Sequence, residues 1–332
     1  MWEIRRYNAE CKEEWDAFVE KSRNATFLFR RDYMDYHSNR FADFSLLAYR
    51  HGKLAAILPA NVEGDILHSH QGLTYGGWAL LPGIDTSDIY FLWREWLAYC
   101  RANDITSIIY KPLPYIYAEM PSEEDRYMLF LCNALQVATD ISTTIDLRNN
   151  PGFNTLQRRH LKSASNDFYG HLITADTPEF VARFHAMLSE CLRDRHDSQP
   201  VHSVEELQLL MDRFPDRIRI WSAYSDAAEG MLAGICVYET RLCVHCQYIA
   251  TSAKGREMNM LAPLVAEMID RYTTKGFRYF DFGISNEGGG LFLNPGLNRQ
   301  KTAYGGSGVA YTRYAINIKE AIDRMPATLW PE

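Results

Sequence analysis

FRYFDFGISNEGGGLFLNPGLNRQKTAYGGSGVAYTRY, residues 277–314, is the stretch that decides the fold. It opens with aromatic side chains that alternate between both faces, a pattern typical of a buried strand. We place that strand over 278–282 and its end at Gly283. A polar loop with three consecutive glycines follows, Pro295 opens a short helix, and a closing strand covers 309–314. The residues that indicate the fold therefore lie in the same stretch as a loop that could form the rim of a ligand site.

Two glycine-rich loops indicate places where a ligand can approach the backbone closely. One is the loop just described, and the other precedes the first long helix of the chain. A bulged sheet edge is the alternative interpretation of the earlier loop. The substrate-binding residues that we predict in the two loops are His70, Tyr75, Ser285, Asn286 and Glu287.

Length and composition limit the class of protein. A chain of 332 residues with 47% hydrophobic and 23% charged residues fits two globular domains. The turn cluster at 149–152 places the boundary between domains at 1–150 and 151–332. We find no apolar window that could cross a bilayer and no secretory signal, so we expect a soluble cytoplasmic protein without a membrane span.

Charge and cysteine usage argue against a protein that coats nucleic acid and against a disulfide-rich protein. The net charge of −7 argues against a surface that coats nucleic acid generally, although a local basic patch could still hold a phosphate. The seven cysteines are odd in number and scattered, which does not predict a disulfide framework. Cys243 and Cys246 have the spacing of half a metal site, but no second pair exists, so we predict buried strand cysteines and no metal.

Both halves of the chain show the same order of elements: three antiparallel strands, a helix and one more strand. In the first half the helix begins at Asp85 or Ser87, after a segment, 26–44, that is either packed or a binding wall, and we favour packing. In the second half Asn259 is the expected helix cap. The strands that we predict are 46–50, 54–60, 66–69, 105–110 and 137–147 in the first half, then 217–224, 231–239, 242–250 and 278–282 in the second.

A cluster of titratable residues lies at 193–202, between two expected helices. His196 and His202 are the candidates for accepting a proton, because an imidazole titrates near neutral pH. Asp194 and Asp197 could orient them and contact the substrate. A solvated loop between helices is the alternative interpretation.

The duplicated order of elements resembles the GNAT N-acyltransferase core in tandem, as in the Fem-type peptidyltransferases. The segment LQRRHLKSA, residues 156–164, is similar to the Arg-x-x-hydrophobic-Lys-x-Ala helix of that group. The segment GLNRQKTAYG, residues 296–305, is similar to its Phe-Lys-x-x-Phe-Gly segment, with Gln300 and Tyr304 in place of the phenylalanines. The resemblance implies an α/β fold, with mixed α+β sheets, in two GNAT-like domains.

The resemblance also implies a mechanism, in which an amine attacks a thioester or ester directly. In GNAT enzymes the cofactor pyrophosphate lies at the helix after the third strand, where this chain carries Lys254 and Arg256. The usual spacing is absent after Arg256, so both acyl-CoA and aminoacyl-tRNA remain open as donors. A basic patch at 158–162 could hold tRNA. By resemblance, Lys301 lies beside the donor and Tyr304 protonates the leaving group.

Two functions remain open from the sequence. The first is an acyltransferase that moves an acyl or aminoacyl group to an amine, on a small molecule or a peptidoglycan precursor, held in a cleft between the domains. The second is a binding module for small molecules or peptides on a degenerate GNAT fold. We rank the enzyme first because titratable residues concentrate beside glycine-rich bends.

Overall fold

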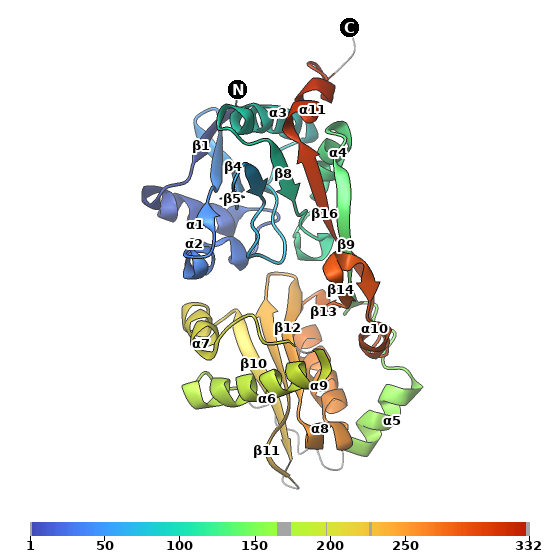
Figure 1. Ribbon diagram of the computed structural model, residues 1–332. Coiled ribbons are helices and arrows are strands. Elements are labelled where there is room, and N and C mark those ends of the chain that lie inside the picture. The colour runs from blue at the N-terminus through green and yellow to red at the C-terminus, as the bar shows by residue number, and fades with distance from the viewer. Residues whose placement is uncertain (1, 165–173, 197, 226–227, 330–332) are drawn as a thin grey trace. The chain divides into compact units, whose positions relative to one another are not determined.

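The computed structural model describes residues 2–164, 174–196, 198–225 and 228–329, which form a mixed α/β fold (Figure 1). The chain divides into two compact units. Unit 1 consists of Met1–Asp140, Gly288–Leu291 and Ala310–Glu332, and unit 2 of Ile141–Glu287 and Phe292–Val309. These units differ from the predicted domains in the placement of 141–150 and of the C-terminal segment, because β9 (Leu135–Asp146) and β16 (Ser307–Asn317) each run from one unit into the other. The domain division at residue 150 stays a prediction.

Unit 1 contains two groups of strands. The first has the antiparallel order β1-β3-β4-β7, and the second has the order β16-β8-β6-β5-β2, in which β6 and β8 are parallel. The predicted strand 66–69 is present as β6, but it does not pair with the predicted strand 54–60. Pro59 cannot donate a backbone hydrogen bond to the ladder, and β4 ends before it. The bounds are β1 Trp2–Arg6, β2 Ala42–Asp43, β3 Leu46–Arg50, β4 Lys53–Leu58, β5 Asn61–Glu63, β6 Ile66–His68, β7 Ala79–Leu80 and β8 Ser107–Tyr110.

Some of the helices of unit 1 begin at a side-chain cap. The helix start that we predict at Asp85 or Ser87 is confirmed, and Asp85 and Asp88 form a capping box at the start of α3 (Thr86–Ala102). The spacing of Ser122 and Asp125 in the sequence also predicts a capping box, and this prediction is wrong, because the Ser122 hydroxyl accepts a hydrogen bond from Arg23 and the next helix begins without a side-chain cap. The other helices of this unit are η1 Ala9–Cys11, α1 Lys12–Lys21, η2 Phe27–Phe29, α2 Arg31–Met34, η3 Asp35–His37, η4 Tyr115–Tyr117, α4 Glu124–Leu131 and α11 Ile318–Arg324.

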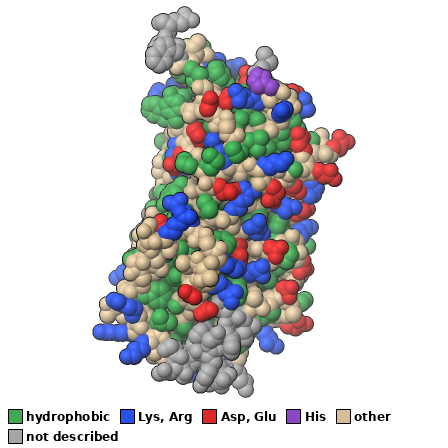
Figure 2. All heavy atoms as spheres, turned by 180° about the vertical axis from the view of Figure 1, so that it is seen from behind, with side chains coloured by type: hydrophobic (Ala, Val, Ile, Leu, Met, Phe, Trp, Pro, Cys, Tyr) green, Lys and Arg blue, Asp and Glu red, His purple; other side chains and the backbone are tan. Residues whose placement is uncertain are grey.

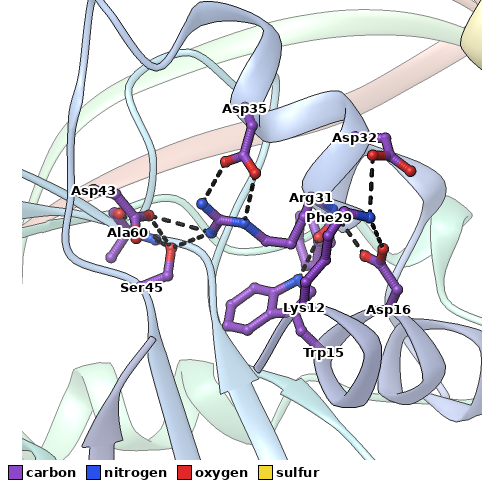
Figure 3. A network of polar contacts seen from close by, with 10 residues as sticks. All are labelled: Lys12, Trp15, Asp16, Phe29, Arg31, Asp32, Asp35, Asp43, Ser45 and Ala60. Carbon is purple, nitrogen blue, oxygen red and sulfur yellow. Dashed lines mark hydrogen bonds and ion pairs between the residues drawn. The ribbon is translucent and has the colours of Figure 1, made fainter. Parts of the chain in front are cut away.

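Segment 26–44 packs into unit 1 around the buried side chain of Arg31 (Figure 3). Its guanidinium pairs with Asp35 and lies 3.3 Å from the Asp43 carboxylate and 3.2 Å from the Ser45 hydroxyl. The guanidinium also lies over the Tyr7 ring, at 3.8 Å from its centroid. A buried charge needs such partners, so the segment is held by packing and paired charges.

Unit 2 has the sheet order β10-β11-β12-β13-β9, with the helix and strand order that the sequence predicts. The spacing of Ser203 and Glu206 in the sequence predicts a capping box, and the two residues form that box at the start of α7. Asn259 is not a helix cap, because an additional short helix, α8, precedes it and is capped by Ser252. The bounds are α5 Thr155–Ala164, α6 Pro178–His196, α7 Val204–Arg213, β10 Ile218–Ser225, β11 Ala228–Glu239, β12 Cys243–Thr251, α8 Ala253–Glu257, α9 Leu261–Thr274, β13 Tyr279–Ile284, β14 Asn286–Glu287, β15 Phe292–Leu293 and α10 Pro295–Thr302.

The parallel pairing of β12 with β13 is short, and this shapes unit 2. It covers Cys243–His245 opposite Tyr279–Asp281, and no pairing between the two strands continues beyond it. The register of β11 against β12 shifts after Cys236, which leaves Gln247 as an extra residue in β12. Gly283 has φ 76°, a conformation that favours glycine, so β13 bends as well. The two strands therefore diverge after His245.

The two faces of this sheet carry different side chains. Val244, Phe280 and Phe282 belong to the hydrophobic core that α9 covers. Because side chains alternate along a strand, His245 and Asp281 belong to the opposite face, against which α6 packs. The chemistry of unit 2 is thus divided between an apolar face and a polar face.

Replacing Phe280 with Ala should destabilise the protein by about 3–5 kcal/mol, because its fully buried ring leaves a cavity in the core under α9. Phe292→Ala is the matched control, since that ring is 68% exposed. Denaturant unfolding monitored by circular dichroism measures both. Equal midpoints for the two variants would contradict a central position for β13.

Candidate functional site

A pocket of about 410 Å³ lies in unit 2 where β12 and β13 diverge. Its apolar wall comes from Ile249 of β12, Val265 of α9, Phe282 of β13 and Leu297 of α10. Leu192 of α6 lines it as well, so the pocket reaches helices from both faces of the sheet. An apolar pocket of this size with a few polar groups is typical of a small-molecule site.

Lys301 is the charged group buried at this pocket. Its Nζ atom donates hydrogen bonds to the backbone oxygens of Gly283, at 2.9 Å, and Ile284, at 2.6 Å. Burial lowers the pKa of Lys301 to about 8, although the negative charge of Asp281 acts in the opposite direction. The lysine thus holds the bent end of β13 and also lines the pocket.

Gln157 of α5 presents a buried amide to the pocket. The side chain is only 6% exposed, and its Oε1 atom has no hydrogen-bond partner within the part of the chain that the structure describes. The α5 backbone is held in place, since the Gln157 N–H donates to the Asn154 side chain. A buried acceptor without a partner is costly, so this oxygen is suited to a donor group on a ligand.

Tyr304 lines the pocket beyond the end of α10. Its ring stacks on Phe282, with centroids 5.6 Å apart, and contacts Phe153 edge to face. Burial raises the pKa of Tyr304 to about 12, against a smaller lowering effect from Gln300. The hydroxyl is therefore protonated at neutral pH, as a proton donor would need to be.

The two cations predicted to bind the cofactor differ in position. Arg256 lines the pocket and donates from Nη1 to the Thr251 backbone oxygen at 2.8 Å. Lys254 is exposed, pairs with Glu257 at 3.1 Å and is not among the pocket residues. Of the two, only Arg256 is placed to reach a ligand in this pocket.

A polar cluster that we did not predict from the sequence lies at the divergence itself. The carboxylate of Asp281 is fully buried and lies 2.7 Å from Nδ1 of His245. The hydroxyls of Ser142 and Thr144, both on β9, donate to its other oxygen. Burial alone would raise the pKa of Asp281, but the hydrogen bonds and the charge of His245 lower it to about 2. The sequence signal that could have revealed this cluster is Asp281 itself, a single charged residue within an aromatic strand.

The predicted proton acceptors lie elsewhere on α6 and beyond it. His202 is buried, with Nδ1 2.5 Å from the hydroxyl of Tyr248. Helix α6 continues to His196, so His196 and Asp194 belong to a helix and not to the loop that we predicted. Asp194 is exposed, and the side chain of His196 and the whole of Asp197 lie outside the described residues. His202 and Asp194, the two whose side chains the structure describes, do not line the pocket.

The predicted substrate-binding residues of unit 1 are buried in packing. His70 stacks on His37 with ring centroids 5.5 Å apart, and its Nδ1 accepts a hydrogen bond from the Gly72 N–H. Burial lowers the pKa of His70 well below its usual range. The Tyr75 hydroxyl donates to Thr26 at 3.0 Å. A role in substrate binding stays a prediction for both.

The predicted rim residues support the backbone of unit 2. Ser285 is buried, and its backbone N–H donates to Ile141. Asn286 accepts from the Ile141 N–H at 2.6 Å, and Glu287 accepts from the Asn294 side chain at 3.3 Å. These contacts hold the segment between β13 and α10, and none of the three residues lines the pocket.

Comparisons with known proteins agree with this architecture. Residues 156–288 match the family model described as an acetyltransferase (GNAT) domain. FemX is similar in structure, with a TM-score of 0.65, 10% identity, and coverage of 93% of this chain and 96% of that one. The C-terminal domain of a putative lysylphosphatidylglycerol synthetase from Agrobacterium fabrum has a TM-score of 0.56 and 12% identity, covering 95% and 94%. No curated protein sequence matches this chain.

A third structure is a tandem GNAT protein from the clavulanic acid biosynthesis pathway, with a TM-score of 0.53, 13% identity, and coverage of 96% of this chain and 99% of that one. The predicted fold of two GNAT-like domains and its resemblance to the Fem-type group are thereby confirmed. Among the described residues, no helix has both the length and the apolar character to cross a membrane, and no group of His, Cys, Asp and Glu side chains could hold a metal ion.

The buried charge of Lys301 predicts a pH-dependent stability. Its folded pKa of about 8 lies below the ordinary 10.5, so the folded state bears a penalty below pH 8 that is relieved as the pH rises toward 10.5. Relative to Lys301→Met, the wild type should gain up to about 3 kcal/mol over that range. Urea unfolding at several pH values measures this, and Lys254→Met controls for the loss of an exposed lysine. A constant difference across pH would contradict a buried ammonium.

Proposed function

Because residues 156–288 match a GNAT domain and the chain has the tandem GNAT-like fold, we propose that it is an N-acyltransferase whose acyl donor binds in the pocket of unit 2. The observation that carries the proposal is the position of the pocket. It opens where β12 and β13 stop pairing, and it is lined by the segments that resemble family motifs, α5 and α10. The position of the pocket in the fold and the motif-like segments that line it therefore both support the same site.

The walls of the pocket favour a donor with a narrow, largely apolar chain that contains an amide. Ile249, Val265 and Phe282 would contact such a chain, and the Gln157 oxygen would accept a hydrogen bond from an amide N–H. The pantetheine arm of an acyl-CoA has this chemistry. Arg256 would then lie toward the phosphates, as the resemblance implies.

An aminoacyl-tRNA donor is the alternative that the Fem-type resemblance brings. Arg158, Arg159 and Lys162 are exposed on α5 and could contact phosphates. The face in Figure 2 shows Lys and Arg side chains interspersed with Asp and Glu side chains, not a continuous basic surface. We therefore place acyl-CoA first and keep tRNA as an outcome of the binding experiment below.

The reaction needs no covalent intermediate on the protein. The acceptor amine attacks the thioester carbonyl, and the thiolate that leaves takes a proton. Tyr304 is protonated and lines the pocket, so it can supply that proton, and Lys301 can stabilise negative charge beside it. The acceptor class implied by the resemblance is an amine on a small molecule or a peptidoglycan precursor.

Gln157→Leu should weaken binding of acetyl-CoA by about 3- to 10-fold, because it removes the unpaired buried amide oxygen at the pocket and keeps the side-chain volume. Isothermal titration calorimetry measures the affinity. Arg159→Leu, an exposed change on the same helix, is the matched control and should bind acetyl-CoA as the wild type does.

Two other results would point away from this donor. Binding of aminoacyl-tRNA but not of acetyl-CoA or longer acyl-CoAs, with loss of binding in Arg158→Leu and Arg159→Leu, would favour the tRNA donor. Binding of none of these donors would favour the non-catalytic binding module.

A further inference from the structure

We propose that Cys191 of α6 is a modification site in the pocket of unit 2, where its thiol forms a mixed disulfide with the oxidised form of a pantetheine-type carrier thiol. This inference rests on the proposed acyl donor, because the donor and the disulfide share the same carrier chain. It adds to the acyl transfer a means of closing the pocket. While the carrier is bonded to Cys191, no acyl donor can enter.

Helix α6 holds Cys191 against the sheet. The helix packs on β11 and β12, and this packing is close at Gly234, where a Cβ atom would meet the Phe184 ring at 2.7 Å. The Met187 side chain lies next to the same glycine. Cys191 follows Met187 by one helical turn and so belongs to the same face of α6. The Cys191 side chain is 9% exposed and lines the pocket, so its thiol is part of the pocket wall.

The other six cysteines differ from Cys191 in their position. All of them lie in the part of the chain that the structure describes, and none of them lines the pocket. Cys243 is fully buried in β12, and Cys11, which is partly exposed, belongs to unit 1. Cys191 is therefore the thiol that a ligand in the pocket of unit 2 can meet.

Burial also makes most of the remaining thiols unreactive. It raises their pKa values and so disfavours the thiolate, which is the form that attacks a disulfide. The thiols concerned are those of Cys100, Cys132, Cys236 and Cys246.

A second group in the same pocket indicates which ligand brings a sulfur atom to Cys191. The Gln157 side chain is 6% exposed, and its Oε1 atom has no hydrogen-bond partner among the described residues. A pantetheine chain offers an amide N–H to this oxygen and an apolar remainder to Ile249 and Phe282. That chain ends in a thiol. A bound carrier and Cys191 therefore share one pocket, which raises the effective concentration of one sulfur for the other.

The exchange balances in atoms and electrons. The Cys191 thiol gives its proton to water, and the thiolate attacks one sulfur of the carrier disulfide. A bond forms between Sγ of Cys191 and that sulfur, the original bond between the two carrier sulfurs breaks, and the second carrier leaves as a thiolate that takes up a proton. The carrier disulfide is the oxidant, and it is reduced as the Cys191 thiol is oxidised. An excess of free thiol reverses the exchange.

The first test uses the full wild-type chain and requires no variant. The protein is incubated with CoA disulfide, and peptide mass spectrometry follows the adduct at each cysteine over time. Cys191 should gain the CoA adduct faster than Cys11. Desulfo-CoA, which has no sulfur and so can neither acylate nor exchange, should slow the reaction at Cys191 and leave that at Cys11 unchanged. Bis(2-hydroxyethyl) disulfide, which has no carrier chain to bind, should modify Cys191 more slowly than CoA disulfide does.

An unmodified Cys191 under conditions that modify Cys11 would overturn the proposal, since Cys191 would then only pack as a small apolar residue. Modification of Cys191 that desulfo-CoA does not slow would overturn it as well. The proposed acyl transfer fails differently. If acetyl-CoA binds but CoA disulfide leaves Cys191 unmodified, the donor site stands and the modification site does not. If desulfo-CoA protects Cys191 but no amine is ever acetylated, the modification site stands and the acyl transfer does not.

The second test measures whether the adduct closes the pocket. Isothermal titration calorimetry gives the affinity for acetyl-CoA before and after treatment with CoA disulfide. The treated wild type should lose binding, and dithiothreitol should restore it. Cys191→Ser and Cys191→Ala should each give the same Kd before and after treatment, and circular dichroism checks that both are folded. Cys11→Ser is the matched control and should lose binding as the wild type does. A wild type that carries the adduct on Cys191 and still binds acetyl-CoA would overturn the proposal.

Discussion

The buried carboxylate of Asp281 is the interaction on which the arrangement of unit 2 depends. An ionised group inside a protein is costly unless each oxygen is satisfied, and here the donors come from two neighbouring strands. His245 belongs to β12, and Ser142 and Thr144 belong to β9, so one side chain fixes the register of three strands. The contacts that satisfy the charge also orient the imidazole of His245.

Next to Asp281, the pairing between β12 and β13 ends. The extra residue in β12 and the left-handed backbone at Gly283 turn the two strands apart. Lys301 donates hydrogen bonds to the backbone oxygens of Gly283 and Ile284. A lysine in that position holds the bent end of β13 and brings a positive charge to the pocket. The same physical need, to satisfy buried backbone groups, thus shapes both the fold and the site.

Local signals in the sequence predicted the elements of the chain well. The helix start predicted at Asp85 or Ser87 and the capping box predicted at Ser203 are present, and the predicted strands and helices of unit 2 occur in the expected order. The expected cap at Asn259 failed because the preceding residues form a helix of their own. Pairing was harder to predict, since a pattern of alternation identifies the strand at 66–69 but not its neighbour.

The sequence by itself determined the duplicated order of elements, the fold class and the two motif segments that line the pocket, because periodicity and turn chemistry act over a few residues. Only the tertiary structure decided which polar residues meet. His245 and Asp281 are 36 positions apart, and Ser142 is 139 positions from Asp281, so no local pattern connects them. His202, in a cluster rich in titratable residues, pairs with a tyrosine instead. Side chains come together through strand register, and register depends on long-range packing that a single sequence does not display.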